Sequence, residues 1–227
     1  MTNTVNTTLY NLQPNQLLLA SKSPRRKELL SQLGYQFTVT NSDIDESILS
    51  GESPSDYVLR LAVAKAQYAF NQLSQERQQV TLVLGSDTSV VVQGKILGKP
   101  TDETHCAKML GLLSNTTHQV FTSIAVVRLQ CLSQKDASNN NLRSQQVNSA
   151  LVTTDVLFKL LTTNEIKQYW LTGEPQDKAG GYGIQGIAGQ FIKSIKGSYS
   201  AVVGLPLYET ATLLQQCGLS TSLLHSD

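Results

Sequence analysis

Apolar residues follow two different spacings along this chain. Residues 17–20 form an unbroken run of Leu and Ala, which is typical of a buried strand. From Pro54 to about Leu73 apolar residues recur at helical spacing, and Ser53 ahead of Pro54 is a common helix start. Segments of both kinds interleave along the chain, which predicts an α/β fold.

The same signals place the remaining elements. We expect strands at 37–39, 80–84, 90–92, 95–97, 119–129, 152–160, 191–195 and 201–203. We expect helices at 24–33, 102–113, 163–173 and 206–218. Ser23 and Thr162 are the expected N-caps of two of these helices. The Gln-Gly pair at 93–94 is typical of a hairpin turn.

Polar stretches divide the chain into one domain and its appendages. We expect residues 1–16 to be a flexible polar tail, 17–218 a single domain, and 219–227 a C-terminal tail. Inside the domain, the polar segment 75–79 is expected to be a linker. Residues 130–149, rich in Asn, Ser and Gln, are expected to form an exposed loop insertion.

Composition narrows the class of protein. The 227 residues carry 18 Lys and Arg against 17 Asp and Glu, a net charge of +1, which argues against a nucleic-acid partner. No run reaches the ~18 apolar residues of a membrane span, and residues 1–16 lack the features of a secretory signal. Cys106, Cys131 and Cys217 form no close pair, which argues against a disulfide framework or structural zinc. We therefore expect a cytoplasmic protein.

Two hydroxyls and two guanidinium groups gather at 21–26, where the first strand meets the first helix. The free N–H groups and the dipole of a helix N-terminus favour an anion there. Arg25 and Arg26 oppose that dipole unless an anion joins them, and guanidinium groups match phosphate oxygens. The motif indicates either a polyphosphate site or a solvated helix cap with surface arginines.

Carboxylates and a lysine add to this chemistry. The acidic segment 43–46 suits Mg²⁺, which binds a few carboxylates together with substrate phosphates; the alternative is an acidic turn. Lys65 falls inside the edge of the apolar side of the long helix, so it either extends to water or points into a cleft. Asp87 follows an apolar strand, a position at which a carboxylate can accept a proton from water. Lys99 ends the returning strand and can meet phosphate charge, although both residues also suit an exposed hairpin.

A glycine-rich segment at 180–189 permits close approach of the backbone to a ligand. Its spacing is not that of a dinucleotide-binding motif. Gln185 offers a donor and an acceptor on one planar amide, which complements the imide edge of uracil or thymine. The alternative is a flexible loop in which this amide bonds to the backbone.

Taken together, these segments resemble the Maf family of nucleoside triphosphate pyrophosphatases, from about Leu17 to Leu214. The resemblance is carried by ASKSPRRKELLSQLG, DIDES, RLAVAKA, LGSDTSVVVQGKILGKP, TTDVLFKLLT and DKAGGYGIQGIAGQFIKSIKGSYSAVVGLPLYET. It implies an α/β fold around an elongated mixed sheet flanked by helices, similar to the inosine triphosphatase-like proteins. It also implies hydrolysis of a nucleotide between the α- and β-phosphates, with a divalent cation, Mg²⁺ or Mn²⁺, and a possible homodimer.

The resemblance also assigns roles to residues. It places the general base at Asp87, with Glu46 as its acidic partner, and both as metal ligands. It places polyphosphate contacts at Ser21, Arg25, Arg26, Lys65 and Lys99. It places substrate choice at Arg25, Thr88 and Gln185.

The segment Gly-Ile-Gln-Gly at 183–186, which contains Gln185, resembles the branch that acts on dTTP and UTP. A branch that acts on 7-methyl-GTP tends to carry an acidic residue at that position, and a carboxylate suits guanine better than an imide. Lys22 stands where Gly is common in the family. Two alternatives remain: a pyrophosphatase for other modified nucleotides, and a nucleotide-binding regulator of cell division or septum formation.

Overall fold

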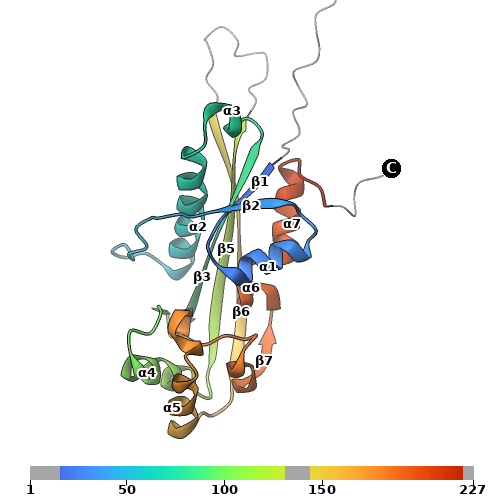
Figure 1. Cartoon of the computed structure of the whole chain (residues 1–227). Helices are drawn as coiled ribbons and strands as arrows, with labels where there is room; N and C mark the ends of the chain where they lie inside the picture. The colour runs from blue at the N-terminus through green and yellow to red at the C-terminus, as the bar shows by residue number, and fades with distance from the viewer. Residues whose placement is uncertain (1–15, 131–143, 222–227) are drawn as a thin grey trace, which may run out of the picture.

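A seven-stranded mixed sheet runs the length of the protein (Figure 1). The structure is a computed structural model, and it describes residues 16–130 and 144–221. The strand order is β2-β1-β3-β5-β6-β7, and β4 pairs with β3. The expected elongated mixed sheet flanked by helices is therefore confirmed.

The elements follow one another in an interleaved order. The strands are β1 (Gln16–Ala20), β2 (Phe37–Thr40), β3 (Thr81–Val92), β4 (Lys95–Leu97), β5 (Thr117–Gln130), β6 (Ser144–Phe158) and β7 (Ile192–Lys196). The α-helices are α1 (Pro24–Gln32), α2 (Pro54–Asn71), α3 (Gln75–Gln78), α4 (Glu103–Leu113), α5 (Thr163–Leu171), α6 (Tyr199–Val203) and α7 (Leu207–Gln216). The short 3₁₀ helices are η2 (Glu174–Asp177), η3 (Ala179–Gly181) and η4 (Ile187–Phe191).

The pairing of β3 leaves part of one edge open. Parallel β1 pairs with β3 as far as Leu84, and antiparallel β4 pairs with it from Val90 onward. On the other edge, β5 pairs with β3 continuously from Val83 to Val91. On the first edge, segment 85–89 therefore lies in the gap between β1 and β4. On the other edge, it is fully paired with β5.

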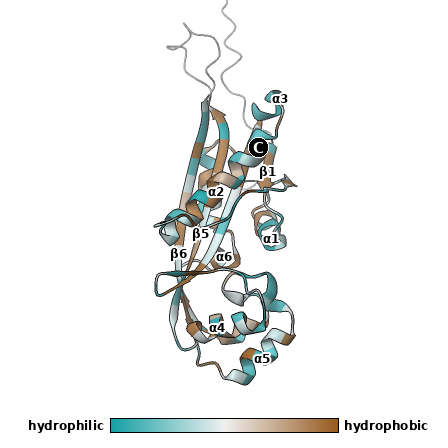
Figure 2. Cartoon of the chain, turned by 90° about the vertical axis from the view of Figure 1, so that its left-hand side faces the viewer, coloured by the Kyte–Doolittle hydropathy of each residue, from teal (hydrophilic) through white to brown (hydrophobic). Residues whose placement is uncertain are grey.

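Helices cover both faces of the sheet. Helix α2 packs on one face through small and apolar residues such as Ala62, Ala66 and Phe70. Helices α1, α6 and α7 lie on the opposite face, where Leu30 and Leu214 join the core. A third apolar cluster, which includes Phe158, joins α4, α5 and β7. Figure 2 shows α4 and α5 together at one end of the molecule.

Local signals in the sequence explain several helix and turn boundaries. The Ser53 hydroxyl accepts a hydrogen bond from the Asp56 amide, and Thr162 forms a capping box with Glu165. Gln93 and Gly94 both have positive φ, 50° and 73°, as the two-residue hairpin turn requires. These three predictions are confirmed.

Four boundaries differ from the sequence-based expectation. Residues 201–203 belong to helix α6, which the Ser198 hydroxyl caps, and residues 75–78 form helix α3, which Ser74 caps. Residues 144–149 belong to β6 and pair with β5, and Gln130 ends β5, so these residues are not part of the expected loop 130–149. Asp87 lies inside β3, and not after its end. The local pattern of apolar and polar residues misled in each case, because side-chain capping or cross-strand pairing outweighed it.

The ends of the chain fall partly outside the description. β1 begins at Gln16, and the Leu219 amide donates to the Leu214 carbonyl, so ordered structure reaches slightly beyond the expected 17–218. Residues 1–15, 131–143 and 222–227, which hold most of the expected tails and loop, lie outside the described residues. No helix within residues 16–130 and 144–221 combines the length and apolarity needed to cross a membrane.

Candidate active site

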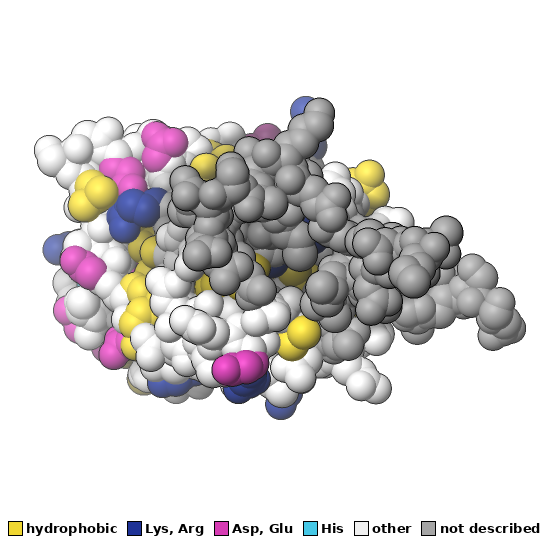
Figure 3. Space-filling model, turned by 90° about the horizontal axis from the view of Figure 1, so that it is seen from above, with side chains coloured by type: hydrophobic (Ala, Val, Ile, Leu, Met, Phe, Trp, Pro, Cys, Tyr) yellow, Lys and Arg dark blue, Asp and Glu magenta, His cyan; other side chains and the backbone are white. Residues whose placement is uncertain are grey.

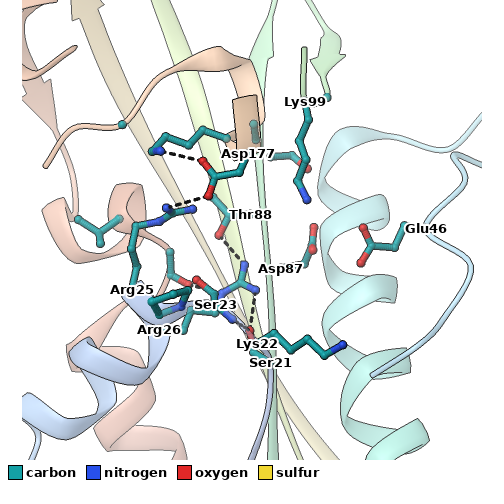
Figure 4. A pocket seen from close by; sticks show the side chains of 18 of the residues that line it. Ser21, Lys22, Ser23, Arg25, Arg26, Glu46, Asp87, Thr88, Lys99 and Asp177 are labelled. Atoms are coloured by element: carbon teal, nitrogen blue, oxygen red, sulfur yellow. Dashed lines mark hydrogen bonds and ion pairs between the residues drawn. The ribbon is translucent and has the colours of Figure 1, made fainter. Parts of the chain in front are cut away.

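A cavity of about 740 Å³ opens at the free edge of β3. It is lined by every residue to which the family resemblance assigned a role, and by Lys22: Ser21, Lys22, Arg25, Arg26, Glu46, Lys65, Asp87, Thr88, Lys99 and Gln185. These residues come from six separate stretches of the chain. The structure therefore brings together in one place what the sequence offered as separate motifs (Figure 4).

The alternation of β3 assigns its two central side chains to different neighbours. Asp87 faces helix α2, and its carboxylate is buried, with 7% of the residue exposed. Thr88 points to the opposite face, where its hydroxyl meets the side chains of Arg26 and Thr122 at 3.2 and 3.1 Å. Two adjacent residues of β3 therefore face opposite sides: Asp87 faces the side with Glu46 and Lys65, which we call the acidic wall, and Thr88 faces the side with Arg26.

Lys65 joins the two carboxylates of the acidic wall. Its Nζ lies 2.7 Å from Asp87 Oδ1 and 2.7 Å from Glu46 Oε1. Of the two readings of Lys65, the one in which it points into a cleft is correct, since only 7% of the residue is exposed. The structure thereby supplies buried countercharge for the carboxylate of Asp87.

Gly85 allows α2 to come this close to β3. A Cβ at Gly85 would overlap the Ala62 carbonyl oxygen and would lie 2.8 Å from the Ala66 amide nitrogen. Any larger side chain would push the helix away from the strand. The small residues on both elements therefore set the distance at which Lys65 meets Asp87.

Burial and charge act in opposite directions on Asp87. Desolvation raises the pKa of its carboxyl above the ordinary value, while the positive charges of Lys65 and Arg26 lower it in part. A carboxylate whose pKa is raised in this way is a stronger base for a proton of water.

Arg26 crosses the cavity floor and fixes three elements. Its guanidinium donates to the Gly204 carbonyl at 2.9 Å, to Thr88 Oγ1 at 3.2 Å and to Ser21 Oγ at 3.3 Å. Desolvation lowers its pKa. The alternative of a surface arginine is therefore wrong for this residue, and its guanidinium presents buried positive charge beside Asp87.

The start of α1 differs from the expected cap. The Ser23 side chain makes no capping hydrogen bond. Instead, the Ser23 amide donates to the hydroxyl of Ser21 at 3.2 Å, and Ser21 is itself buried. The N-terminus of α1 therefore opens on the cavity, with Ser21 as the hydroxyl at its entrance.

Asp177, at the start of the segment DKAGGYGIQG, is a cavity residue to which the sequence analysis assigned no role. Its carboxylate lies 3.7 Å from Arg25 and accepts a hydrogen bond from Lys178 at 2.8 Å. Figure 4 shows Arg25 directed toward Asp177, while Lys99 projects into the same space from the other side. An acidic residue three positions before the glycine-rich segment was the available signal. Its partner, 152 positions away, could not be read from the sequence.

The acidic segment contributes one carboxylate to the cavity, not three. Glu46 lines the cavity, whereas Asp43 and Asp45 are exposed and Asp45 accepts hydrogen bonds from Ser47. Helix α2 fixes the segment, because the Tyr57 hydroxyl donates to the Glu46 carbonyl at 2.9 Å and Arg60 donates to the Ser47 carbonyl at 2.9 Å. Its position next to Asp87 is thus set by α2.

The donor set suits a hard cation that also binds phosphate. Two carboxylates, those of Glu46 and Asp87, already converge on one positive charge, the ammonium of Lys65. Among residues 16–130 and 144–221, no group of three or more His, Cys, Asp or Glu side chains could hold a metal ion alone. Mg²⁺ commonly binds through one or two carboxylates and completes its shell with water and substrate phosphates, so these residues fit it.

Fold and cavity together define a class of protein. The arrangement is that of an α/β protein whose cavity suits a small, highly charged anion: Arg25 and Arg26 lie on one side, and the carboxylates of Glu46 and Asp87, joined by Lys65, on the other. Figure 3, seen from above, shows basic and acidic side chains interspersed over the described atoms in view, and not a basic field. This distribution suits one small anion better than a nucleic acid.

The chain belongs to the Maf family: the family model described as Maf-like protein matches residues 16–217. A dTTP/UTP pyrophosphatase of Colwellia psychrerythraea is 56% identical over 91% of both chains. Those of Pseudoalteromonas atlantica and Vibrio vulnificus are 50% and 48% identical, over 90% and 89% of this chain and 98% of each relative. Among solved structures, the Ham1 protein of Staphylococcus aureus is similar at a TM-score of 0.36 and 14% identity, over 62% of this chain and 71% of that one.

Proposed function

We propose that this protein is a nucleoside triphosphate pyrophosphatase that hydrolyses dTTP and UTP to the monophosphate and pyrophosphate. The observation that carries the proposal is the joint presence, in one cavity, of the Glu46–Lys65–Asp87 cluster and the guanidinium groups of Arg25 and Arg26. The relatives that bear the name dTTP/UTP pyrophosphatase, at 48 to 56% identity, support the choice of nucleotide.

In this proposal Asp87 acts as general base. It takes a proton from a water molecule that attacks one phosphorus of the α–β anhydride, and the bond between that phosphorus and the bridging oxygen breaks. Its raised pKa and its burial suit that role. Among residues 16–130 and 144–221, Lys65 is the one cation within ion-pair distance of the Asp87 carboxylate.

The basic residues stabilise negative charge on the phosphates. Arg26 is held in a fixed orientation by three hydrogen bonds, so little reorganisation is needed when the charge develops. Arg25, Lys65, Lys99 and the hydroxyl of Ser21 line the same cavity and complete the polyphosphate site. When substrate binds, its phosphates replace Asp177 as the partner of Arg25.

Glu46 and Asp87 would hold a divalent cation, Mg²⁺ or Mn²⁺. When bound, such a cation withdraws electron density from the phosphates and makes the anhydride easier to cleave. Thr88 and Arg25 lie where they can influence substrate choice, and Gln185 is proposed to recognise the imide edge of the pyrimidine. A homodimer and a cytoplasmic location remain predictions.

A nucleotide panel tests the proposal. The protein is incubated with dTTP, UTP, 7-methyl-GTP and other triphosphates, with and without Mg²⁺, and the products are separated. We expect the monophosphate and pyrophosphate from dTTP and UTP, dependent on the cation. Formation of the diphosphate and inorganic phosphate would exclude cleavage between the α- and β-phosphates, and preference for 7-methyl-GTP would exclude the proposed substrates.

A further inference from the structure

The segment that carries Gln185 is held at both of its ends. We call residues 183–186 the cavity turn; all four line the cavity, and the Gly186 amide closes the turn by donating to the Gly183 carbonyl at 3.1 Å. On the side before it, the buried hydroxyl of Tyr182 lies 2.8 Å from His118 Nε2. Beyond the turn, the chain meets the side chain of Glu174.

Three donors converge on the carboxylate of Glu174. The Tyr169 hydroxyl donates to Oε1 at 2.8 Å, the Ile187 amide to Oε2 at 2.7 Å, and the Ala188 amide to Oε1 at 3.3 Å. Tyr169 comes from α5 and is itself fixed by edge-to-face packing on Phe191. Glu174 thus ties the chain just after the cavity turn to a rigid helix.

The position of Gly186 shows how closely the Glu174 carboxylate approaches the cavity turn. A Cβ at Gly186 would overlap both carboxylate oxygens of Glu174. The residue directly after Gln185 therefore has to be glycine if Glu174 occupies this place. Neither Glu174 nor Tyr169 lines the cavity, so their contacts act on the turn and not on a ligand.

We infer that Glu174 is a positioning residue, which fixes the cavity turn so that Gln185 is presented to the base of the nucleotide. The inference rests on the proposed role of Gln185. Because recognition by a planar amide needs its donor and acceptor in place before binding, loss of the Glu174 contacts weakens base recognition while phosphate contacts on α1 and β3 stay intact.

The variant Glu174→Gln keeps the size of the side chain and breaks this arrangement. An amide in one orientation sets an N–H group against the Ile187 amide, and in the other against the Ala188 amide. Glu165→Gln is the matched control, because Glu165 also accepts a backbone amide and a hydroxyl, both from Thr162, but does not line or support the cavity turn. Tyr169→Phe removes one of the three donors and leaves both backbone contacts.

The test compares a nucleotide with a probe that has no base. For each purified variant, KM and kcat for dTTP are measured, together with the inhibition constant of inorganic triphosphate. For Glu174→Gln we expect KM for dTTP to rise about tenfold or more with an unchanged inhibition constant. Tyr169→Phe should show a smaller rise, and Glu165→Gln should match the wild type in both quantities. Gln185→Glu serves as the reference for lost base recognition.

Each outcome decides a different point. If Glu174→Gln keeps the wild-type KM while Gln185→Glu raises it, the positioning role is wrong and the proposed function stands. Equal loss of dTTP and triphosphate binding also overturns it, because general disruption then explains the change. If the wild type releases no pyrophosphate from dTTP, the proposed function fails, and amide hydrogen exchange at Ile187 and Ala188 decides whether Glu174 orders the turn. Unchanged exchange in Glu174→Gln contradicts that ordering.

Discussion

The ammonium of Lys65 donates a 2.7 Å hydrogen bond to Oδ1 of Asp87. The first residue lies in the middle of α2, the second in the middle of β3, and 22 positions separate them. Because Asp87 is buried, this ion pair is the main compensation for the cost of keeping a carboxylate there. The first two predictions follow from it.

Replacing Asp87 by Asn removes the proposed base and keeps the size of the side chain. We expect turnover of dTTP to fall by about a thousandfold or more, because proton transfer from water is lost. The circular-dichroism spectrum and the unfolding midpoint should remain close to those of the wild type. Asp155→Asn, an isosteric change on β6 outside the cavity, is the control. Near-normal turnover in the Asp87 variant would remove it from the mechanism.

Replacing Lys65 by Met should shift the pH profile. The positive charge of Lys65 lowers the pKa of Asp87, so its removal raises that pKa further. The acid limb of kcat/KM, which reports the free enzyme, should therefore move to higher pH, in addition to an overall fall in rate. The measurement is kcat/KM for dTTP over the acid to neutral range. An acid limb that stays in place would show that it does not report Asp87.

Replacing Arg26 by Lys keeps the positive charge but removes the planar guanidinium group with its several N–H donors. A lysine ammonium cannot reach Gly204, Thr88 and Ser21 from one fixed orientation as the guanidinium does. We expect a loss of about 2 kcal/mol in the free energy of unfolding and a fall in kcat of about tenfold or more. Urea unfolding and steady-state kinetics measure both. Arg77→Lys on the exposed helix α3 is the control, and equal behaviour of the two variants would contradict the prediction.

The Arg60–Glu52 ion pair should make stability depend on pH. The hydrogen bond from Arg60 lowers the pKa of Glu52 from 4.5 to about 2. Because the folded pKa lies below the unfolded one, the stabilisation is complete above about pH 4.5 and is lost as the pH falls through about 2. Glu52→Gln should therefore be less stable than the wild type at neutral pH, and the difference should shrink at about pH 3. A difference that is constant with pH would contradict this assignment.

Replacing Gln185 by Glu tests the proposed reading of the base. A carboxylate offers no donor to the imide oxygen, so kcat/KM for dTTP and UTP should fall by about tenfold or more. Gln168→Glu, which adds the same charge on the exposed side of α5, should leave both substrates unaffected. Steady-state kinetics on the two nucleotides is the measurement. If both variants keep wild-type rates, another cavity residue recognises the base.

Much of this protein is determined by local sequence. Helix starts at Ser53 and Thr162 and the turn at Gln93 depend on contacts between near neighbours, and the sequence alone predicts them. Most of the proposed site residues could also be identified from motifs with their own chemistry, such as the paired arginines and the acidic segment, whereas no role could be assigned to Asp177. Each motif also had an interpretation without a ligand, such as a solvated helix cap or an acidic turn. The local sequence could not decide between the two interpretations.

Tertiary structure made that choice. The alternation of β3 sets Asp87 toward α2 and Thr88 toward Arg26, and Gly85 sets the distance, but only the packed sheet and helix reveal which side is which. Arg25 meets Asp177, and Glu174 meets the cavity turn, through contacts that depend on the path of the whole chain. The sequence by itself determined which chemical groups are available. The tertiary structure decided which of them meet, because distance and burial are properties of the packed chain and not of any single segment.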